Sequence, residues 1–154
     1  MRKATSLTGF IILVFACAAL GSWFTFQGVN EWYQTISKPA WTPPSWIFGP
    51  VWTALYVTIA VSAWLIWEGG HPGKQRALTL WGIQLGLNVF WSACFFAWKN
   101  PALALVEIVL LWASILATIL VFKPLNRYAA WLLIPYLCWV SFATALNAAI
   151  WRLN

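Results

Sequence analysis

Three polar residues recur at every fourth position within one apolar stretch: Gln84, Asn88 and Ser92. Residues four apart lie on the same face of an α-helix, so their side chains form one stripe. Asn and Ser can hydrogen-bond a ligand, but in a membrane such a stripe also bonds one helix to the next. The spacing therefore predicts a ligand-contacting face or a helix–helix interface, and leaves both open.

Aromatic residues with helical spacing flank this stripe in the sequence. They are Trp52 and Tyr56 in one apolar stretch, and Trp139 with Ala143 and Asn147 in another. If the stretches are antiparallel helices, these residues gather at the depth of Asn88 and Ser92, beneath the long segment 27–46. Such a lining suits a flat, mostly apolar ligand that carries a few polar groups.

The common catalytic and metal-binding constellations cannot be assembled from this sequence. His71 is the only histidine, and it lies among Gly and Pro on the side opposite the predicted pocket. Neither a Ser-His-Asp set nor a metal or haem site can be built around it. The three cysteines, Cys17, Cys94 and Cys138, lie in apolar runs, where we expect them to act as small packing residues.

Glu107 is the only acidic residue well inside an apolar stretch. An acid at that depth can bind a proton or a ligand. It can also form an ion pair with Lys99 or Arg152, which we expect on the same side of the membrane. We favour the ion pair.

The composition requires a membrane. The chain has 154 residues, of which 62% are hydrophobic and only 8% are charged, whereas a soluble domain carries roughly 25% charged residues. A transmembrane helix needs about 20 apolar residues, and backbone groups in hydrocarbon must be satisfied within the span. We therefore predict a single domain, residues 1–154, that is an all-α bundle of five transmembrane helices with a long, ordered first loop. The predicted spans are residues 5–26, 47–67, 77–97, 102–122 and 128–151.

Basic residues predict the orientation of the bundle. Six Lys and Arg residues fall on the side of the N-terminus and three on the other, so the N-terminus should be cytoplasmic and the C-terminus outside. The net charge of +6 then reflects loop bias and not nucleic-acid binding. We expect a prokaryotic plasma membrane, with an outer membrane as the alternative. Arg2, Lys3 and the small residues 16–19 also resemble a cleavable signal peptide.

Short connections predict that consecutive helices pack as antiparallel neighbours. Gly82 and Gly86 form a small-xxx-small motif, which permits close helix approach. The motif predicts either a homodimer or packing within the chain. Pro135 should kink the last helix just before Trp139.

Two ordered blocks, with Asn88, Trp91 and Ser92 between them, resemble the TspO/MBR family of tryptophan-rich sensory and translocator proteins. The first block, in residues 32–56, contains Lys-Pro-Ala-Trp-Thr-Pro-Pro at 38–44; the second, in residues 131–154, contains Pro-Tyr-Leu-Cys-Trp-Val-Ser-Phe-Ala at 135–143. The resemblance covers nearly the whole chain. Members of this family form five-helix membrane bundles and are often dimeric.

The resemblance implies a receptor or sensor for tetrapyrroles such as protoporphyrin IX or haem, linked to tetrapyrrole regulation and stress response, with no required cofactor. Some members bind sterols or isoquinoline-type ligands, although the Tyr of the sterol pattern is missing before Arg152. The implied ligand-binding residues are Tyr33, Trp52, Asn88, Ser92, Trp139, Phe142, Ala143 and Asn147. The loop that covers them is expected to be stiffened and anchored by Lys38, Pro39, Trp41, Pro43 and Pro44.

Two other functions remain open beside the receptor. One is a light- and oxygen-dependent porphyrin-degrading enzyme, in which Trp52 and Trp139 donate electrons to the excited porphyrin. The other is a tetrapyrrole or sterol transporter, against which the lack of an inverted repeat argues.

Overall fold

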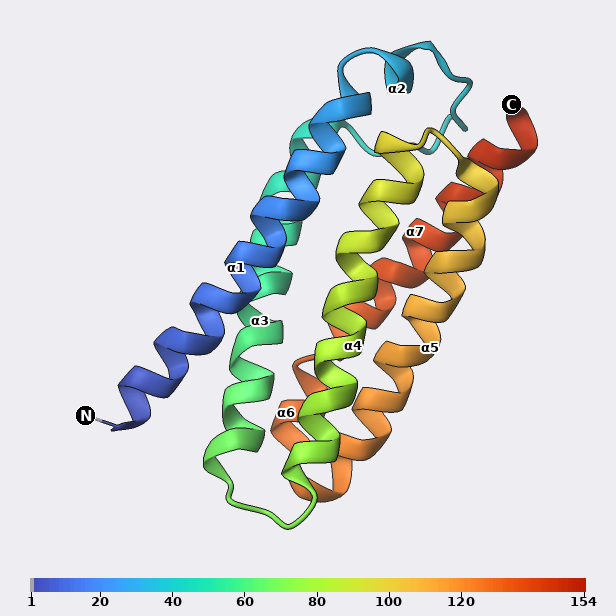
Figure 1. The fold of residues 1–154 in the computed structure, drawn as a ribbon. Helices are drawn as coiled ribbons and strands as arrows, with labels where there is room; N and C mark the ends of the chain where they lie inside the picture. The colour runs from blue at the N-terminus through green and yellow to red at the C-terminus, as the bar shows by residue number, and fades with distance from the viewer. Residues whose placement is uncertain (1) are drawn as a thin grey trace.

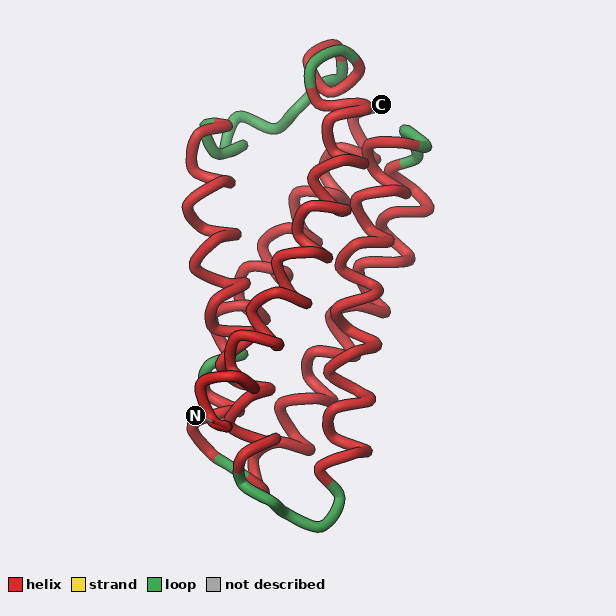
Figure 2. The backbone as a smooth tube through the Cα atoms, turned by 60° about the vertical axis from the view of Figure 1, so that its left-hand side comes forward, coloured by secondary structure: helices red, strands yellow, loops and turns green. Residues whose placement is uncertain are grey.

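The computed structural model describes residues 2–154, with side chains from Ala4 onward, and this part of the chain contains helices and no strand (Figure 2). The elements are α1 (Arg2–Val29), α2 (Trp32–Thr35), η1 (Ser45–Ile47), α3 (Phe48–Glu68), α4 (Lys74–Ser92), the π-helix η2 (Ala93–Ala97), α5 (Pro101–Leu125), α6 (Arg127–Trp131) and α7 (Ile134–Leu153). Five stretches are long and apolar enough to cross a membrane: Ala4–Val29, Ser45–Glu68, Lys74–Ala97, Pro101–Leu125 and Arg127–Leu153. The prediction of five spans is confirmed, with each boundary within a few residues.

The long helices form a bundle in which α1 packs against α3 and α4, α4 against α5, and α5 against α7 (Figure 1). α3 packs against α6 and, to a lesser extent, α7. Consecutive helices are packed neighbours as expected, although α3 and α4 each contact α1 more extensively than each other. The Trp81 indole of α4 also donates to the Ile59 carbonyl of α3 at 3.1 Å. A short connection fixes only the adjacent ends of two helices, and their packing along the rest of their length depends on the side chains.

α1 is a packed member of the bundle. Val14 on α1 is fully buried, and Gly28 lies so close to η2 that a Cβ there would overlap the backbone carbonyl of Phe96. This approach requires glycine, because any other residue would push the two segments apart. The packing of α1 favours a structural span over a cleavable signal peptide.

The last span is interrupted, as Pro135 predicts. α6 ends at Trp131, two residues form a turn, and α7 begins at Ile134 with Pro135 in its first turn. Proline has no N–H to donate to the preceding turn, so the helical ladder breaks there. α7 therefore begins five residues before Trp139.

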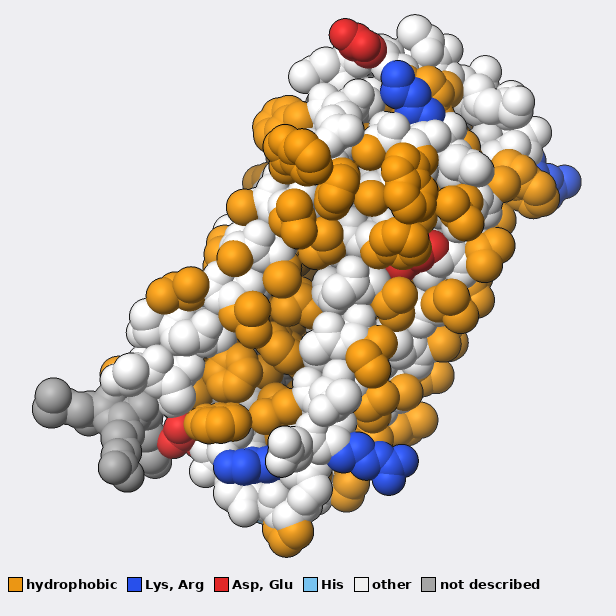
Figure 3. All heavy atoms as spheres, in the orientation of Figure 1, with side chains coloured by type: hydrophobic (Ala, Val, Ile, Leu, Met, Phe, Trp, Pro, Cys, Tyr) orange, Lys and Arg blue, Asp and Glu red, His pale blue; other side chains and the backbone are white. Residues whose placement is uncertain are grey.

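The chain connections alternate between the two ends of the bundle. One end holds the connection between α1 and α3 (residues 30–44, here called loop 1), the α4–α5 connection and Asn154; the other holds the α3–α4 connection and α6 (Figure 1). Lys and Arg side chains lie near both ends, and apolar side chains cover much of the surface between them (Figure 3). This arrangement is that of an integral membrane protein. We call the end that holds loop 1, the α4–α5 connection and Asn154 the loop-1 end.

The tryptophans and cysteines divide between surface and interior. Trp41, Trp46, Trp67, Trp98, Trp131 and Trp151 are exposed, as is common for tryptophan where a membrane meets water. Trp32 of loop 1 is half-buried, with its ring 5.5 Å from that of Phe95. Cys94 is buried as a packing residue, whereas Cys138 is exposed, contrary to expectation.

Candidate functional site

Asn88 lies at the centre of a hydrogen-bonded chain that joins three helices. The hydroxyl of Tyr56 on α3 donates to Asn88 Oδ1 at 3.0 Å, and Asn88 Nδ2 donates to the hydroxyl of Tyr136 on α7 at 3.0 Å. Asn88 and Tyr136 are both buried. Both polar atoms of this amide are therefore occupied by the protein itself, which makes Asn88 an organiser of the bundle in this conformation.

Asn147 holds a second hydrogen-bonded group nearer the loop-1 end. Trp91 Nε1 donates to Asn147 Oδ1 at 3.1 Å, and Asn147 Nδ2 donates to the carbonyl of Pro101 at 2.8 Å. These bonds connect α7 to α4 and to the first residue of α5. The predicted Asn88 and Asn147 thus lie in separate groups, each satisfied within the bundle.

The predicted aromatic residues form ring contacts with one another or with neighbours. Trp139 lies 5.6 Å from Phe142 and 5.8 Å from Phe48, measured between ring centroids. Trp41 of loop 1 lies 5.7 Å from Phe142. An aromatic layer therefore runs from α3 across α7 to loop 1.

Trp52 lies one turn along α3 from Phe48 and touches the tyrosines of the Asn88 chain. Its ring centroid is 5.3 Å from that of Tyr56 and 6.2 Å from that of Tyr136. Trp52 is half-buried. Trp52 thus lies next to the two tyrosines that bond Asn88.

The remaining predicted ligand residues are distributed around these groups. Ser92 lies at the interface of α4 with α1, because its Oγ would be 3.6 Å from a Cβ placed on Gly21. Ala143 is half-buried and packs against the main core. Tyr33 packs against Phe95 and Phe96, with ring centroids 6.2 Å and 5.6 Å away. Burial raises the pKa of the Tyr33 hydroxyl.

Loop 1 is held in place by its own polar residues and by the end of the chain. Lys38 Nζ donates to the carbonyls of Tyr33 at 2.6 Å and Ile36 at 3.1 Å, and lies 4.8 Å from the Tyr33 ring centroid. Thr42 bonds the carbonyl of Pro39 through both its amide and its hydroxyl. Pro39 and Pro43 are half-buried and Pro44 is exposed.

Glu107 forms no ion pair with Lys99 or Arg152 in the described part of the chain, so that expectation is wrong. The carboxyl is 3% exposed, and neither oxygen has a hydrogen-bond partner there. Glu107 lies six residues into α5, about 9 Å along the axis from its start. Lys99 and Arg152 are instead exposed near the helix ends.

Gln84, the first residue of the predicted polar stripe, also lacks a partner. It is fully buried, and neither atom of its amide is hydrogen-bonded within the described residues. The stripe on α4 therefore carries three different environments: an unpaired Gln84, a fully bonded Asn88 and a Ser92 that faces α1. Helical spacing identified the face of the helix but not which partners each side chain would find.

Sequence reasoning underrated several residues of these groups. Tyr136 was noted only within a family block, Trp91 only beside it, and Phe48 not at all. A sequence signal existed for Tyr136, which lies one helical turn before Trp139 and directly after Pro135.

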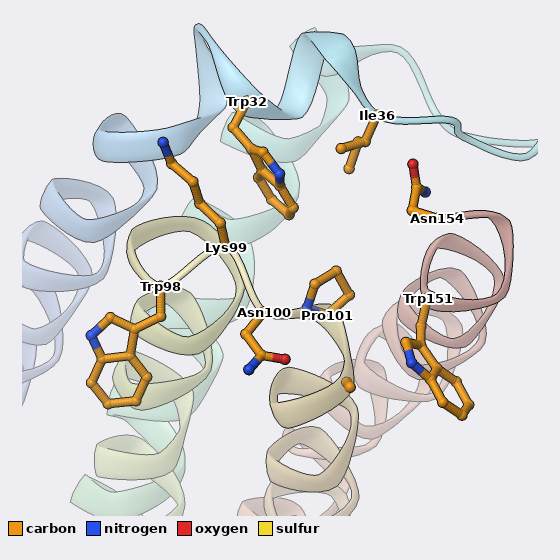
Figure 4. Close-up of a pocket in the computed structure, with 9 residues that line it drawn as sticks. Trp32, Ile36, Trp98, Lys99, Asn100, Pro101, Trp151 and Asn154 are labelled. Atoms are coloured by element: carbon orange, nitrogen blue, oxygen red, sulfur yellow. The ribbon is translucent and has the colours of Figure 1, made fainter.

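A cleft of about 450 Å³ lies at the loop-1 end, next to the Asn147 group, which bonds the carbonyl of the lining residue Pro101 (Figure 4). It is lined by Trp32, Ile36, Trp98, Lys99, Asn100, Pro101, Ala102, Trp151 and Asn154. None of the predicted ligand-binding residues lines it. Among the described residues, no three His, Cys, Asp or Glu side chains are grouped so that they could hold a metal ion.

Gly82 and Gly86 lie on the surface of α4. Both are exposed, and a Cβ added at either position would meet no atom within 4 Å. Packing within the chain therefore does not account for the motif. The two glycines leave a shallow exposed face on α4.

Comparison with known proteins agrees with the fold. The TspO/MBR family model matches residues 10–152. The chain is 43% identical over 148 residues to the Tryptophan-rich protein TspO of Archaeoglobus fulgidus, covering 96% of each chain. It is 43% identical over 155 residues to the protein of the same name from Chlorobaculum tepidum, covering 99% of this chain and 98% of the other. The human Translocator protein is 38% identical over 138 residues, covering 88% and 82%. With a five-span bundle rich in tryptophan and matched along nearly its whole length, the chain belongs to the TspO/MBR family.

Proposed function

We propose that this protein is a membrane receptor that binds tetrapyrroles, such as protoporphyrin IX or haem, in the loop-1 half of the bundle. The observation that carries the proposal is the aromatic layer of Trp41, Phe142, Trp139 and Phe48 beneath loop 1. Large aromatic faces stack favourably on flat ring systems. Family membership supports a ligand-binding role in the membrane.

Residues around this layer offer aromatic faces to the flat rings of such a ligand and hydroxyl groups to its polar edge. Trp139 and Trp52 present indole faces from α7 and α3, with Phe142 and Ala143 beside Trp139 on α7. The Asn88 chain holds the hydroxyls of Tyr56 and Tyr136 next to Trp52, so a polar edge of the ligand can exchange bonds with them. Ser92, Asn147 and Tyr33 complete the proposed lining, and Lys38, Pro39, Pro43 and Pro44 keep loop 1 in a definite shape above it.

Tryptophan fluorescence in the dark tests the proposal. Purified, detergent-solubilised protein is titrated with protoporphyrin IX, and saturable quenching is expected. Trp139→Phe and Trp52→Phe keep an aromatic ring but lose indole area, so each should raise the dissociation constant about three- to tenfold. Trp46→Phe is the matched control, because Trp46 is 73% exposed and lies outside the aromatic layer.

The outcomes separate cleanly. Weaker binding in Trp139→Phe and Trp52→Phe, with Trp46→Phe unchanged, supports the site. Non-saturable quenching in the wild type, or equal affinity in all four proteins, contradicts it. Ligands of the sterol and isoquinoline classes can be tested by competition in the same assay.

A light-dependent porphyrin oxidase is the second candidate, and the ring contacts of Trp52 with Tyr56 and Tyr136 favour it. In that scheme the excited porphyrin takes one electron from the indole and passes it to oxygen, which gives superoxide. Superoxide then adds to the porphyrin ring, and the adduct returns one electron to the indole radical cation, directly or through a neighbouring tyrosine, so that the net reaction is the addition of O₂ to the porphyrin. The rate at which the visible absorption band disappears under light should depend on Trp52 and Trp139. An equal rate in protein-free detergent micelles excludes the enzyme.

We further propose that the protein forms a homodimer and that its N-terminus is cytoplasmic in a prokaryotic plasma membrane. The exposed Gly82 and Gly86 support the dimer, and the six-to-three distribution of basic residues supports the orientation. The orientation can be tested in intact cells with a membrane-impermeant thiol reagent. The reagent should label a cysteine introduced in loop 1 and should not label one introduced in residues 69–73.

A further inference from the structure

The cleft at the loop-1 end is built from the ends of three spans and from loop 1. Trp98 follows the third span, Pro101 begins the fourth and Trp151 lies near the end of the fifth. Trp98 and Trp151 are 56% and 51% exposed, and tryptophan concentrates where a membrane meets water. The cleft therefore lies at the level of lipid headgroups.

The free polar side-chain atoms of the cleft are hydrogen-bond donors. Asn100 Oδ1 already accepts from the amide of Leu103 at 3.0 Å, which leaves its Nδ2 available. The indole nitrogens of Trp32 and Trp151 make no hydrogen bond within the described residues, and both lie on the sides of their rings that face Pro101 (Figure 4). A lining of donors complements a ligand that carries several acceptors.

The charge of the cleft points to an anion. Lys99 is the one charged residue among those that line it, and no Asp or Glu is among them. Lys99 has φ 51°, a left-handed conformation that is uncommon for a residue other than glycine. Its side chain rises beside Trp32 with Nζ directed away from Pro101 (Figure 4), so the cation lies at the rim of the cleft. The positive end of the α5 dipole adds to the same field.

The frame of the cleft is fixed by contacts between distant parts of the chain. Asn154 Oδ1 accepts from the amide of Ser37 at 2.9 Å, and its Nδ2 donates to the carbonyl of Ser37 at 2.9 Å and to that of Ile150 at 2.8 Å. Trp32 packs its ring 5.5 Å from that of Phe95. Loop 1 and α7 thereby form two walls that are held in a defined position.

An apolar track leads away from the cleft along α5. Leu103, Val106 and Leu110 are 40%, 63% and 56% exposed, and their spacing places them on one face of the helix. α5 starts at the cleft with Pro101 and Ala102 and runs toward the opposite end of the bundle. A ligand that enters the cleft with its polar end can therefore lay an acyl chain along this face.

We propose that this cleft binds the headgroup of an anionic phospholipid, with the phosphate among the donors beside Pro101, Lys99 at the rim and an acyl chain along α5. The apolar track favours a lipid over a free phosphate, which would use the donors alone. The cation of Lys99 disfavours a zwitterionic lipid, whose quaternary ammonium it repels. The residues that line this cleft differ from those of the proposed tetrapyrrole site, although Asn147 of that site bonds the carbonyl of Pro101 at 2.8 Å.

Native mass spectrometry tests the site on the full chain. Protein is released from nanodiscs that contain equal amounts of phosphatidylglycerol and phosphatidylcholine with identical acyl chains. The first bound lipid should be phosphatidylglycerol by about fivefold, as expected for one basic residue near a membrane surface. Lys99→Asn keeps a side chain that tolerates the left-handed conformation and should remove this preference. Ala102→Trp should lower retention of the lipid by filling the cleft.

Arg152→Gln is the matched control, since it removes an exposed basic residue of the same end that does not line the cleft. It should keep the preference. A wild-type protein without preference for phosphatidylglycerol overturns the proposal, as does an equal loss in Arg152→Gln and Lys99→Asn. Displacement of the lipid by an equal concentration of glycerol 3-phosphate would assign the cleft to the phosphate alone and overturn the lipid. Unchanged thermal unfolding of the variants confirms that each has folded.

Discussion

Asn88 Nδ2 donates a hydrogen bond to the hydroxyl of Tyr136 at 3.0 Å, in the buried centre of the bundle. The other end of the same amide accepts from Tyr56, so one side chain of α4 joins α3 to α7. Lipid provides no alternative partners, so a buried hydroxyl that loses its bond stays unpaired. The stability of the bundle should therefore depend on this amide.

Replacing Asn88 by leucine should lower the free energy of unfolding by about 1–3 kcal/mol for each tyrosine hydroxyl that it leaves unpaired. The measurement is denaturant or thermal unfolding in detergent. Adding Tyr56→Phe to Asn88→Leu should recover part of the loss, because it removes one of the unpaired hydroxyls. If the double variant has a lower free energy of unfolding than Asn88→Leu alone, the role assigned to Asn88 is contradicted.

Glu107→Leu should have the opposite effect on stability. Glu107 is as buried as Asn88, but neither of its oxygens has a partner within the described residues. An unpaired buried polar group costs about 1–3 kcal/mol, and leucine of similar size removes that cost. The same unfolding experiment should show a more stable protein, and a less stable one would mean that the carboxyl has a structural partner.

The contrast between Asn88 and Glu107 shows what a single sequence can and cannot predict. Apolar length and composition were enough for the five spans, because a bilayer imposes one helix length on all of them. Helical spacing was enough to bring Asn88 and Trp52 to a similar depth, where both contact Tyr56 and Tyr136. The missing N–H of Pro135 was enough to anticipate the break in the last span. These features depend on short-range geometry, which the residue order carries directly.

Partner choice depends on long-range packing and was predicted less well. Glu107 was expected to pair with a basic residue on its own side, but its depth in α5 keeps it away from the helix ends where Lys99 and Arg152 lie. The cleft was not anticipated at all, because it combines residues of loop 1, of the α4–α5 connection and of α7. The π-helix η2 likewise has no evident mark in its own sequence.

Gly28→Ala should destabilise the bundle, because a Cβ there overlaps the Phe96 carbonyl and forces α1 away from η2. Overpacking of this kind typically costs about 1–3 kcal/mol. Gly9→Ala on the same helix is the control: a Cβ at that position meets nothing within 4 Å. Alanine there should stabilise α1 by about 0.5–1 kcal/mol. Equal unfolding temperatures for the two variants would contradict the close approach.

Gly82→Leu should weaken the proposed homodimer without unfolding the monomer. The position is exposed on α4 and has free space around it, so a larger side chain is tolerated within one chain but blocks close approach of a second α4. Analytical ultracentrifugation in detergent would report the shift toward monomer. Gly9→Leu, at an equally open glycine of α1, should leave the oligomeric state unchanged, and a shift in both variants would place the interface elsewhere.

Asn154→Ala should release loop 1 without unfolding the bundle. The Asn154 amide bonds the backbone of Ser37 at both its N–H and its carbonyl, across 117 residues of sequence. These groups lie near the surface, so water replaces the lost bonds and the global stability should fall by less than about 1.5 kcal/mol. Hydrogen exchange at the Ser37 amide should nevertheless become faster, because local opening then needs fewer broken contacts.

Gln34→Ala is the matched control, since Gln34 Nε2 bonds only the nearby carbonyl of Val29 at 3.1 Å, and its loss should leave exchange at Ser37 unchanged. If loop 1 covers a ligand site, Asn154→Ala should also speed association of protoporphyrin IX, and unchanged exchange at Ser37 would show that other contacts hold the loop in place.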